Sequence, residues 1–371
     1  MAPKRKPRKP TNGQPPWVGQ SVRRKEEARL VRGQGRFVDD YKLQGMLHLR
    51  FVRSPYAHAR VLSVDVAEAA AYPGVVCTLT GAEVAAMVQP FIEIGPPPGG
   101  KIVDYPMGAD KVRYQGEPVA AVVAESLLAA EDAAELVRVD YEALDPVIDA
   151  EDALKDQSVL HASSGTNVVW QGKFEYGKVD KAFKEAAHVV TIDRMHFHRF
   201  SSSPLEGNAV IAQWDTTENN LHYWCNNQFP TFGIQFLSPA LGIPIDRIRV
   251  ETHDIGGGFG IKITSYPQMA VCALASRKAG GLPVKWVETR SEHMTSSAHG
   301  NERTFLDTRV ALDKDGRILA IESRHLDNCG AYPRYEPLGC IIWAQVLPGT
   351  YRFRNLRMDF TQVVSNKCPV G

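Results

Sequence analysis

A glycine run near residue 256 is the densest group of residues that could hold a ligand through the backbone. Gly256, Gly257, Gly258 and Gly260 supply four glycines in five positions, with Phe259 between them. Without Cβ atoms, such a turn can adopt positive φ and its N–H groups can lie against a ligand. A short strand before the run and a helix after it would present those donors to an anion. The run therefore predicts a site for a large polar ligand, and an ordinary tight turn is the plain alternative.

The familiar nucleotide-binding motifs do not fit this run. If Gly256 and Gly258 are the first glycines of G-x-G-x-x-G, the third position is Ile261. The Walker A motif needs Lys and Ser or Thr directly after its last glycine, and this sequence lacks that pair there. A nucleotide-binding regulator is therefore the weakest of the functions considered.

Gln228 is a second candidate for chemistry. It follows a strand pattern that ends in Asn226 and Asn227, and it precedes Pro230 and a helix pattern. A glutamine at the end of a strand can donate an N–H to an oxo group while its carbonyl accepts another hydrogen bond. Taken alone, Gln228 would be read as a plain amide at the start of a helix.

The histidines and serines give weaker indications. His196 and His198 lie two apart on a predicted strand and could bind a metal, but two histidines on a half-buried strand are the favoured interpretation. His293 and His299 could touch a ligand, although a polar loop is favoured for both. The sequence has no G-x-S-x-G nucleophile elbow, so serine hydrolysis has no support.

These candidates must be positioned by two folded regions that follow an arm. Residues 1–27 are rich in Pro, Lys and Arg and predict a flexible arm. Residues 28–147 alternate short strand and helix patterns, which indicates an α/β domain. A connecting segment at 148–166 leads to residues 167–371, where the strand patterns are longer. Strands are predicted at 47–53, 61–66, 75–80, 119–124, 189–198, 209–214, 221–225, 305–312 and 318–326, and helices at 67–71, 81–87, 126–137, 231–241 and 267–279.

Composition excludes several broad classes. The 371 residues carry a net charge of +1, which gives no general electrostatic reason to bind nucleic acid or an anionic membrane. No apolar run approaches the roughly 20 residues of a membrane span, and the basic N-terminus has no apolar stretch of a signal peptide, so a cytoplasmic location is expected. The six cysteines are scattered without a C-x-x-C pair, which predicts reduced, buried thiols rather than iron–sulfur or zinc ligands.

Several motifs in order along the chain resemble one enzyme family. The chain is similar to the N-terminal half of the molybdenum-binding large subunit of the xanthine dehydrogenase, aldehyde oxidase and carbon monoxide dehydrogenase family. The resemblance rests on five kinds of segment: Gly33–Asp40, Phe51–Arg60, Tyr114–Ala120, Pro204–Glu206 with Asn227-Gln228, and Gly256–Gly260. It implies an α+β fold in which an α/β hammerhead domain at 28–147 precedes the first part of a molybdopterin-binding domain at 167–371.

The resemblance also implies a cofactor and partners. The cofactor is a molybdopterin with molybdenum, usually in the cytosine dinucleotide form in bacteria. Gln228 matches the family's catalytic glutamine, which hydrogen-bonds an oxo ligand of molybdenum, and Gly256 to Gly260 match the loop against the pterin. The family hydroxylates a small substrate with oxygen from water, uses a glutamate base, and passes electrons to iron–sulfur and FAD centres. The resemblance implies that partner subunits carry those centres, and the absence of cysteine clusters here fits iron–sulfur centres on another chain.

Two departures from the family pattern shape the expected function. Ile261-Lys262-Ile263 replaces a Gly-Lys-Glu segment of purine-hydroxylating members, so a purine substrate is disfavoured and aldehydes, N-heteroaromatics and carbon monoxide stay open. The family sequence continues past Gly371 into a second cofactor domain with the glutamate base. We therefore expect a second molybdopterin-binding chain with the C-terminal half as a partner, and no activity without it. A non-catalytic or truncated scaffold is the alternative.

Overall fold

The structure is a computed structural model, and it describes residues 21–297 and 300–370. The chain divides into two units, residues 1–36 and 37–371, of which the second contains all the strands described below. In the first unit, a single helical turn, α1 (Glu27–Leu30), is followed by Gln34, whose N–H donates to the carbonyl of Arg29 at 2.9 Å. Most of the predicted flexible arm, residues 1–20, lies outside the described residues.

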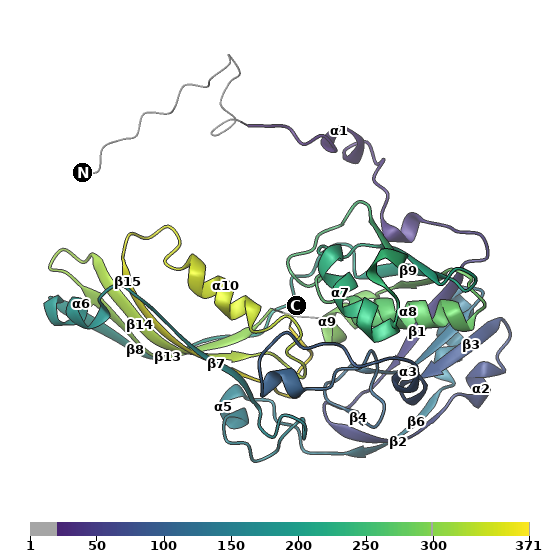
Figure 1. Cartoon of the computed structure of the whole chain (residues 1–371), viewed down its shortest axis with the longest axis horizontal. Coiled ribbons are helices and arrows are strands. Elements are labelled where there is room, and N and C mark those ends of the chain that lie inside the picture. Colours follow the sequence, from purple (N-terminus) through teal and green to yellow (C-terminus); the bar gives the residue numbers. More distant parts are fainter. Residues whose placement is uncertain (1–20, 298–299, 371) are drawn as a thin grey trace. The chain divides into compact units, whose positions relative to one another are not determined.

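A seven-stranded mixed sheet forms the centre of the second unit (Figure 1). Its order is β11 (Ile248–Thr252), β10 (Asn220–Cys225), β9 (Ala209–Asp215), β12 (Val284–Val287), β1 (Leu47–Arg53), β5 (Pro118–Ala124) and β3 (Val75–Thr80). β1 pairs with β12 in parallel and with β5 in antiparallel orientation. The sheet therefore combines strands from both of the predicted domains.

Helices cover both faces of this sheet, which explains why every residue of β5 is buried. On one face, Ala69 of α2 (Ala67–Ala70) and Ala133 of α4 (Leu127–Glu135) pack against Val122. On the other face, α8 (Tyr266–Lys278) is buried over most of its length, together with α7 (Pro230–Leu241) and α3 (Gly81–Met87). Because α8 has core contacts around its circumference, its small and apolar residues show no amphipathic pattern.

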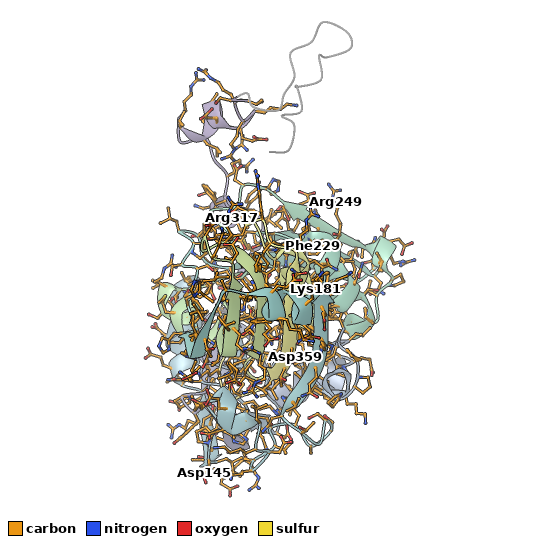
Figure 2. All side chains as sticks on the ribbon, turned by 90° about the vertical axis from the view of Figure 1, so that its left-hand side faces the viewer. Asp145, Lys181, Phe229, Arg249, Arg317 and Asp359 are labelled. Atoms are coloured by element: carbon orange, nitrogen blue, oxygen red, sulfur yellow. The ribbon has the colours of Figure 1, made fainter. Side chains whose placement is uncertain are left out.

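A five-stranded sheet is the second large sheet of this unit. Its order is β7 (Val168–Tyr176), β15 (Asn355–Val363), β14 (Ile318–Asn328), β13 (Glu302–Leu312) and β8 (His188–Phe197). The aromatic face of β15 packs against α10 (Leu338–Val346), and α6 (Val179–Glu185) covers the end of the β13–β14 hairpin. Figure 2 looks toward this sheet, with Lys181 of α6 and Asp359 of β15 labelled.

Smaller elements complete the unit. A three-stranded sheet has the order β4 (Lys111–Val112), β2 (Ala59–Asp65) and β6 (Arg138–Ala143). The remaining helices are α5 (Ala150–Ala153), α9 (Arg290–Ser296) and the 3₁₀ turns η1 (Val38–Asp40), η2 (Gly99–Lys101) and η3 (Ile245–Arg247). Among the described residues, no helix combines the length and apolar composition that a membrane span requires.

The predicted elements recur with small shifts at their ends, but the sequence missed several others. α6, α9, α10, β4, β6, β12 and β15 were not predicted. β8 was expected to be half buried, and this was wrong: nine of its ten residues are exposed, because it is an edge strand with neither face covered among the described residues. The six cysteines are free thiols, and all but Cys77 are buried, as predicted.

Candidate functional site

The glycine loop, residues 256–260, connects the end of β11 with the segment that leads to α8. Gly257 and Gly260 have φ angles of +97° and +96°, which side chains rarely tolerate. A Cβ on Gly258 would lie 2.5 Å from Oε1 of Gln228, so only a hydrogen atom fits between them. The loop and Gln228 are therefore in direct contact, although 27 residues separate Gln228 from Gly256 in the sequence.

The side-chain amide of Gln228 uses its oxygen in a hydrogen bond within the protein, while its NH₂ group has no acceptor among the described residues. Its Oε1 accepts a hydrogen bond from the N–H of Gly260 at 3.0 Å. Its own N–H donates to the carbonyl of Lys262 at 3.3 Å, which ties it to the chain just after the loop. No described residue accepts from Nε2, and the side chain is exposed. The bond to Gly260 fixes the orientation of the amide, so Nε2 is a preset donor for a ligand.

Asn227 holds the end of β10 in place behind Gln228. Its Oδ1 accepts from the N–H of Phe229 at 2.7 Å, and its Nδ2 donates to Ser265 Oγ at 3.0 Å and to the carbonyl of Ile263 at 3.3 Å. Asn227 is 1% exposed. The strand end that carries Gln228 is thereby fastened to the segment that follows the glycine loop.

Glu206 anchors the other side of the loop. Its Oε2 accepts from the N–H of Gly256 at 2.8 Å and from Nζ of Lys262 at 3.1 Å, and its own N–H donates to the carbonyl of Gly256 at 3.2 Å. Lys262 is fully buried, and burial lowers its pKa even though Glu206 acts in the opposite direction. One carboxylate thus neutralises a buried cation and fixes the start of the loop.

A buried hydrogen-bond chain supports the serine segment next to the loop. His293 Nδ1 lies 3.0 Å from Glu288 Oε2, and its Nε2 lies 3.1 Å from Ser201 Oγ. Burial by itself raises the pKa of Glu288, but its hydrogen bonds outweigh that effect and lower the pKa overall. The polar loop expected for His293 was therefore wrong, because this side chain is completely buried on α9. His299 lies outside the described residues.

Large apolar side chains surround the loop and point to solvent. Leu205 is 95% exposed and Phe259 is 71% exposed. Phe200, Phe229 and Met294 are exposed as well, and Met294 Sδ lies 3.8 Å from Oγ of Ser203. Phe229, labelled in Figure 2, is 42% exposed. Exposed apolar groups of this size around a polar loop indicate a surface that another molecule covers.

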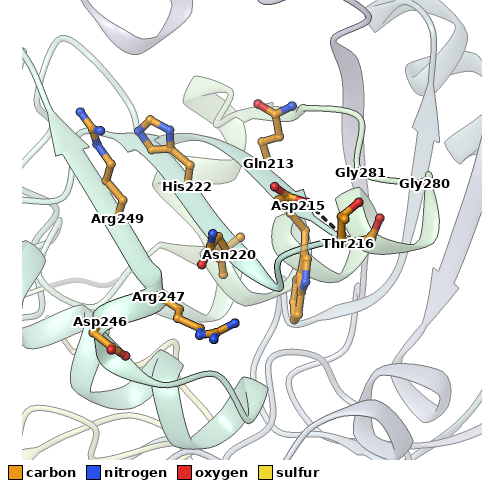
Figure 3. A pocket seen from close by; sticks show the side chains of 13 residues that line it. Gln213, Asp215, Thr216, Asn220, His222, Asp246, Arg247, Arg249, Gly280 and Gly281 are labelled. Carbon is orange, nitrogen blue, oxygen red and sulfur yellow. Dashed lines mark hydrogen bonds between the residues drawn. The ribbon is translucent and has the colours of Figure 1, made fainter.

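A cavity away from the glycine loop has a volume of about 650 Å³. It is lined by residues including Asp215, Asn220, His222, Arg247 and Arg249 (Figure 3). These residues lie at the end of β9 and at the starts of β10 and β11, whereas Gln228 and the glycine loop follow the ends of β10 and β11. Since β10 and β11 run in parallel, the cavity is at the opposite edge of the sheet.

The sequence predicted some residues of this site and missed others. The structure brings Gln228 into contact with Gly258 and Gly260, two of the predicted cofactor-binding residues. Glu206 and Lys262 were not predicted as site residues, and a Lys in a segment of isoleucines gave no sign of its buried ion pair. The ring centroids of His196 and His198 are 4.5 Å apart, but neither belongs to a group of three metal-ligand side chains among the described residues.

Comparison with known proteins assigns the chain to a class. Residues 160–371 match the model described as molybdopterin cofactor-binding domain. Residues 32–145 match the model described as aldehyde oxidase and xanthine dehydrogenase, a/b hammerhead domain. The chain therefore belongs to the family of molybdopterin-binding large subunits of molybdenum-dependent oxidoreductases, and its mixed α and β architecture is the one that the resemblance predicted.

Individual relatives agree with this assignment. The chain is 36% identical over 359 residues to the nicotine 6-hydroxylase large subunit of Paenarthrobacter nicotinovorans, covering 95% of this chain and 44% of that protein. The crystal structure of quinoline 2-oxidoreductase from Pseudomonas putida 86 superposes with a TM-score of 0.86 at 35% identity, covering 95% of this chain and 45% of that one. The chain thus spans about half the length of these relatives. The nicotinate dehydrogenase large molybdopterin subunit of Eubacterium barkeri is 29% identical, and there the match covers 79% of the relative.

The residues of the loop fit a bulky cofactor that carries oxygen acceptors. Gly258 leaves no side chain between the loop and Gln228, and the Nε2 group of Gln228 offers a donor of fixed direction. Glu206 occupies the N–H of Gly256, so that donor is committed to the protein and not to a ligand. Among the predicted cofactor-binding residues, Gly256 consequently acts by anchoring the loop.

Proposed function

We propose that this chain forms one wall of the cofactor chamber of a molybdenum hydroxylase. The observation that carries the proposal is the amide of Gln228, whose Oε1 is held by the N–H of Gly260 while Nε2 stays available beside the glycine loop. The family membership of the chain supports the same interpretation. The catalytic role of Gln228 is to donate a hydrogen bond to an oxygen of the cofactor and so orient it.

The cofactor in this proposal is molybdopterin with molybdenum, in its cytosine dinucleotide form. When bound, it supplies the two-electron redox chemistry of the hydroxylation. Gly257, Gly258, Phe259 and Gly260 lie against it, and Glu206 keeps the loop in shape through Gly256. The exposed side chains of Phe259 and Leu205 exclude water once a partner covers them.

For the substrate, we infer an N-heteroaromatic compound. The relatives described above are named for nicotine, quinoline and nicotinate, which share an electron-poor ring with nitrogen. Attack of a water-derived oxygen is easiest at a ring carbon next to such a nitrogen. Aldehydes and carbon monoxide are the competing substrates that an assay must include.

The partners in this proposal are a second molybdopterin-binding chain with the C-terminal half, an iron–sulfur subunit and an FAD subunit, in the cytoplasm. The match covers 44% of the nicotine 6-hydroxylase large subunit but 79% of the Eubacterium barkeri subunit, so relatives of quite different length contain this part. The exposed apolar rim around the loop supports a surface that is covered in the complex. The base that the reaction requires then comes from the partner, and the chain alone is inactive.

Metal analysis and turnover of the purified complex test the proposal. We expect about one molybdenum per chain in the native complex and dye-linked oxidation of quinoline or nicotinate. Removal of the donor in Gln228→Ala should lower turnover about a hundredfold, since loss of one oriented donor commonly costs that much. A complex without molybdenum would instead favour the scaffold, and full activity of the isolated chain would refute the need for a partner.

A further inference from the structure

Three side chains of metal-ligand type meet beneath the start of α10, away from the glycine loop. Asp327 comes from the end of β14, Glu336 from the turn before α10, and Cys340 from the first turn of α10. One ligand atom from each lies within 4.8 Å of the other two, and Cys340 Sγ is 3.0 Å from Asp327 Oδ2. The three residues are between 0% and 2% exposed.

The protein supplies little positive charge to this group. Asn301 Nδ2 donates to Asp327 Oδ2 and to Glu336 Oε1, both at 2.8 Å. The cationic group nearest to Asp327 Oδ1 is Nε of Arg303 at 3.7 Å, and this oxygen has no hydrogen bond among the described residues. Two carboxylates without a close cation are costly in a dry interior. Either Glu336 takes up a proton, which the raised pKa caused by burial would permit, or a cation enters.

The amide of Gln362 borders the group and has one unpartnered end. Gln362 is 0% exposed, and its Nε2 lies 2.8 Å from Glu336 Oε2, 3.1 Å from Cys340 Sγ and 3.3 Å from Asp327 Oδ2. Its Oε1 has no hydrogen-bond partner among the described residues. In this orientation Nε2 offsets part of the negative charge but leaves a buried carbonyl oxygen unsatisfied. Because the two ends of an amide have the same shape, a half-turn would bring that oxygen into the group, an orientation that a bound metal ion makes favourable.

His325 is a second buried polar group that lacks a hydrogen bond among the described residues. It is 1% exposed and lies two residues before Asp327 on β14, so both side chains extend from one face of the strand. Its ring packs against Phe305, Trp343 and Phe360, and it is not one of the three side chains whose ligand atoms meet.

We propose that Asp327, Glu336 and Cys340 bind one divalent transition-metal ion of the zinc type, with the carbonyl of Gln362 as the fourth ligand. A thiolate mixed with carboxylate oxygens suits zinc, whereas magnesium and calcium prefer oxygen ligands alone. The ion fastens the start of α10 to β14 and β15, since its ligands come from those elements. This site is independent of molybdenum and of the proposed function.

Cobalt substitution tests the thiolate ligand directly. The full chain, alone or in its native complex, is prepared with Co²⁺ or Zn²⁺, and molybdenum is counted separately. We expect about one Co²⁺ per chain and a sulfur-to-cobalt charge-transfer band in the near ultraviolet. Cys340→Ser should abolish the band, and Cys272→Ala, which removes a fully buried thiol on α8, should keep it. Absence of both band and stoichiometric metal in the wild type, or a band that persists in Cys340→Ser, overturns the proposal.

A second variant of nearly unchanged shape tests the metal site without the risk that the protein simply unfolds. Glu336→Gln keeps the size of the side chain and removes one charge. With a metal site, it should weaken zinc binding about tenfold or more, and a chelator should lower the melting temperature of the wild type only. If the cluster merely shares a proton, chelator has no effect on the wild type and Glu336→Gln is as stable as the wild type; this pair of results contradicts the proposal.

Discussion

At the scale of single residues, function in this chain depends on which end of a side-chain amide is already engaged. The bond from Gly260 N–H to Gln228 Oε1 decides the direction of Nε2, and Gly258 permits the approach. Neither Gln228 nor the glycine loop alone defines a donor of fixed direction. Gln228 and Gly258 are 30 positions apart in the sequence, so they looked like separate features. The structure joins them because the strands β10 and β11 that precede them are paired side by side.

Gly258→Ala tests this approach. The new Cβ would meet Gln228 Oε1 at 2.5 Å, so the glutamine must move away from the loop. We expect turnover of the complex to fall by roughly a hundredfold, since small misplacements of catalytic groups have effects of that size. The measurement is steady-state turnover together with molybdenum content.

Gly233→Ala is the matched control. This glycine lies on α7 close to Gln228 in sequence, and a Cβ there would lie 3.7 Å from Asn227 Nδ2, an ordinary contact. Turnover should stay within about twofold of the wild type, because Ala also favours a helix over Gly. Equal losses in the two variants would contradict the role assigned to Gly258.

Glu206→Gln tests the anchor of the loop. The change leaves the fully buried ammonium of Lys262 without its carboxylate. Breaking a buried ion pair from one side costs about 3–5 kcal/mol in the free energy of unfolding, which urea titration can measure. Glu185→Gln on α6 is the control, because its pair with Lys181 is exposed and should contribute less than about 1 kcal/mol.

At the scale of elements, the strand patterns of the sequence were reliable for most strands of five or more residues. β9, β10, β13 and β14 were predicted within three residues of their observed ends. α10 was missed because its sequence is apolar on most sides, and β12 because four residues are too short for a periodic pattern. The exposure of β8 could not be predicted either, since its apolar residues resemble those of a buried strand.

Lysines on β8 should reduce self-association of the isolated chain. Val190 and Ile192 extend from one face of this edge strand and are both exposed. Unpaired strand edges with apolar side chains aggregate, and charges at the edge oppose this. We expect Val190→Lys with Ile192→Lys to lower light scattering of the concentrated chain, whereas Val190→Ile with Ile192→Val should leave it unchanged. Equal light scattering of all three proteins would show that the exposed residues of β8 do not drive self-association.

His161 in the connecting segment should make stability depend on pH. Its Nε2 lies 2.7 Å from the carbonyl of Ala331, and burial lowers its pKa from 6.5 to about 3. Between these values the unfolded chain binds a proton that the folded chain does not, so stability falls as the pH falls through this window. We expect urea titrations at pH values near 7.5 and 5 to differ less in His161→Gln than in the wild type. His188→Gln, at an exposed strand end, should keep the full difference.

At the scale of the whole chain, the central sheet joins the two segments that match separate family models. β1, β3 and β5 come from the hammerhead match, and β9 to β12 from the molybdopterin-binding match. Leu49 and Phe51 of β1 belong to the same core as Trp286 of β12 and the buried residues of α8. The sequence predicted two consecutive regions, but it carried no signal for this shared sheet, because parallel pairing of β1 with β12 links residues far apart.

The fragment 28–147 should therefore not fold cooperatively by itself. Without β12 and α8, one edge of β1 is unpaired and one face of the sheet is bare. We expect a broad urea transition for the fragment and a single steep one for residues 28–371. A sharp transition of the fragment, followed by circular dichroism, would mean that the hammerhead segment is a folding unit of its own.

The bare flanks of β8 also have a consequence for the biogenesis of the protein. Val189, Val190, Ile192, Met195 and Phe197 all face water on this strand. An isolated chain would offer this strand for pairing to other strands, including the same strand of a second copy. We expect a holding chaperone to bind the newly made chain there, and co-purification of a chaperone with the wild type but not with Val190→Lys and Ile192→Lys would show it.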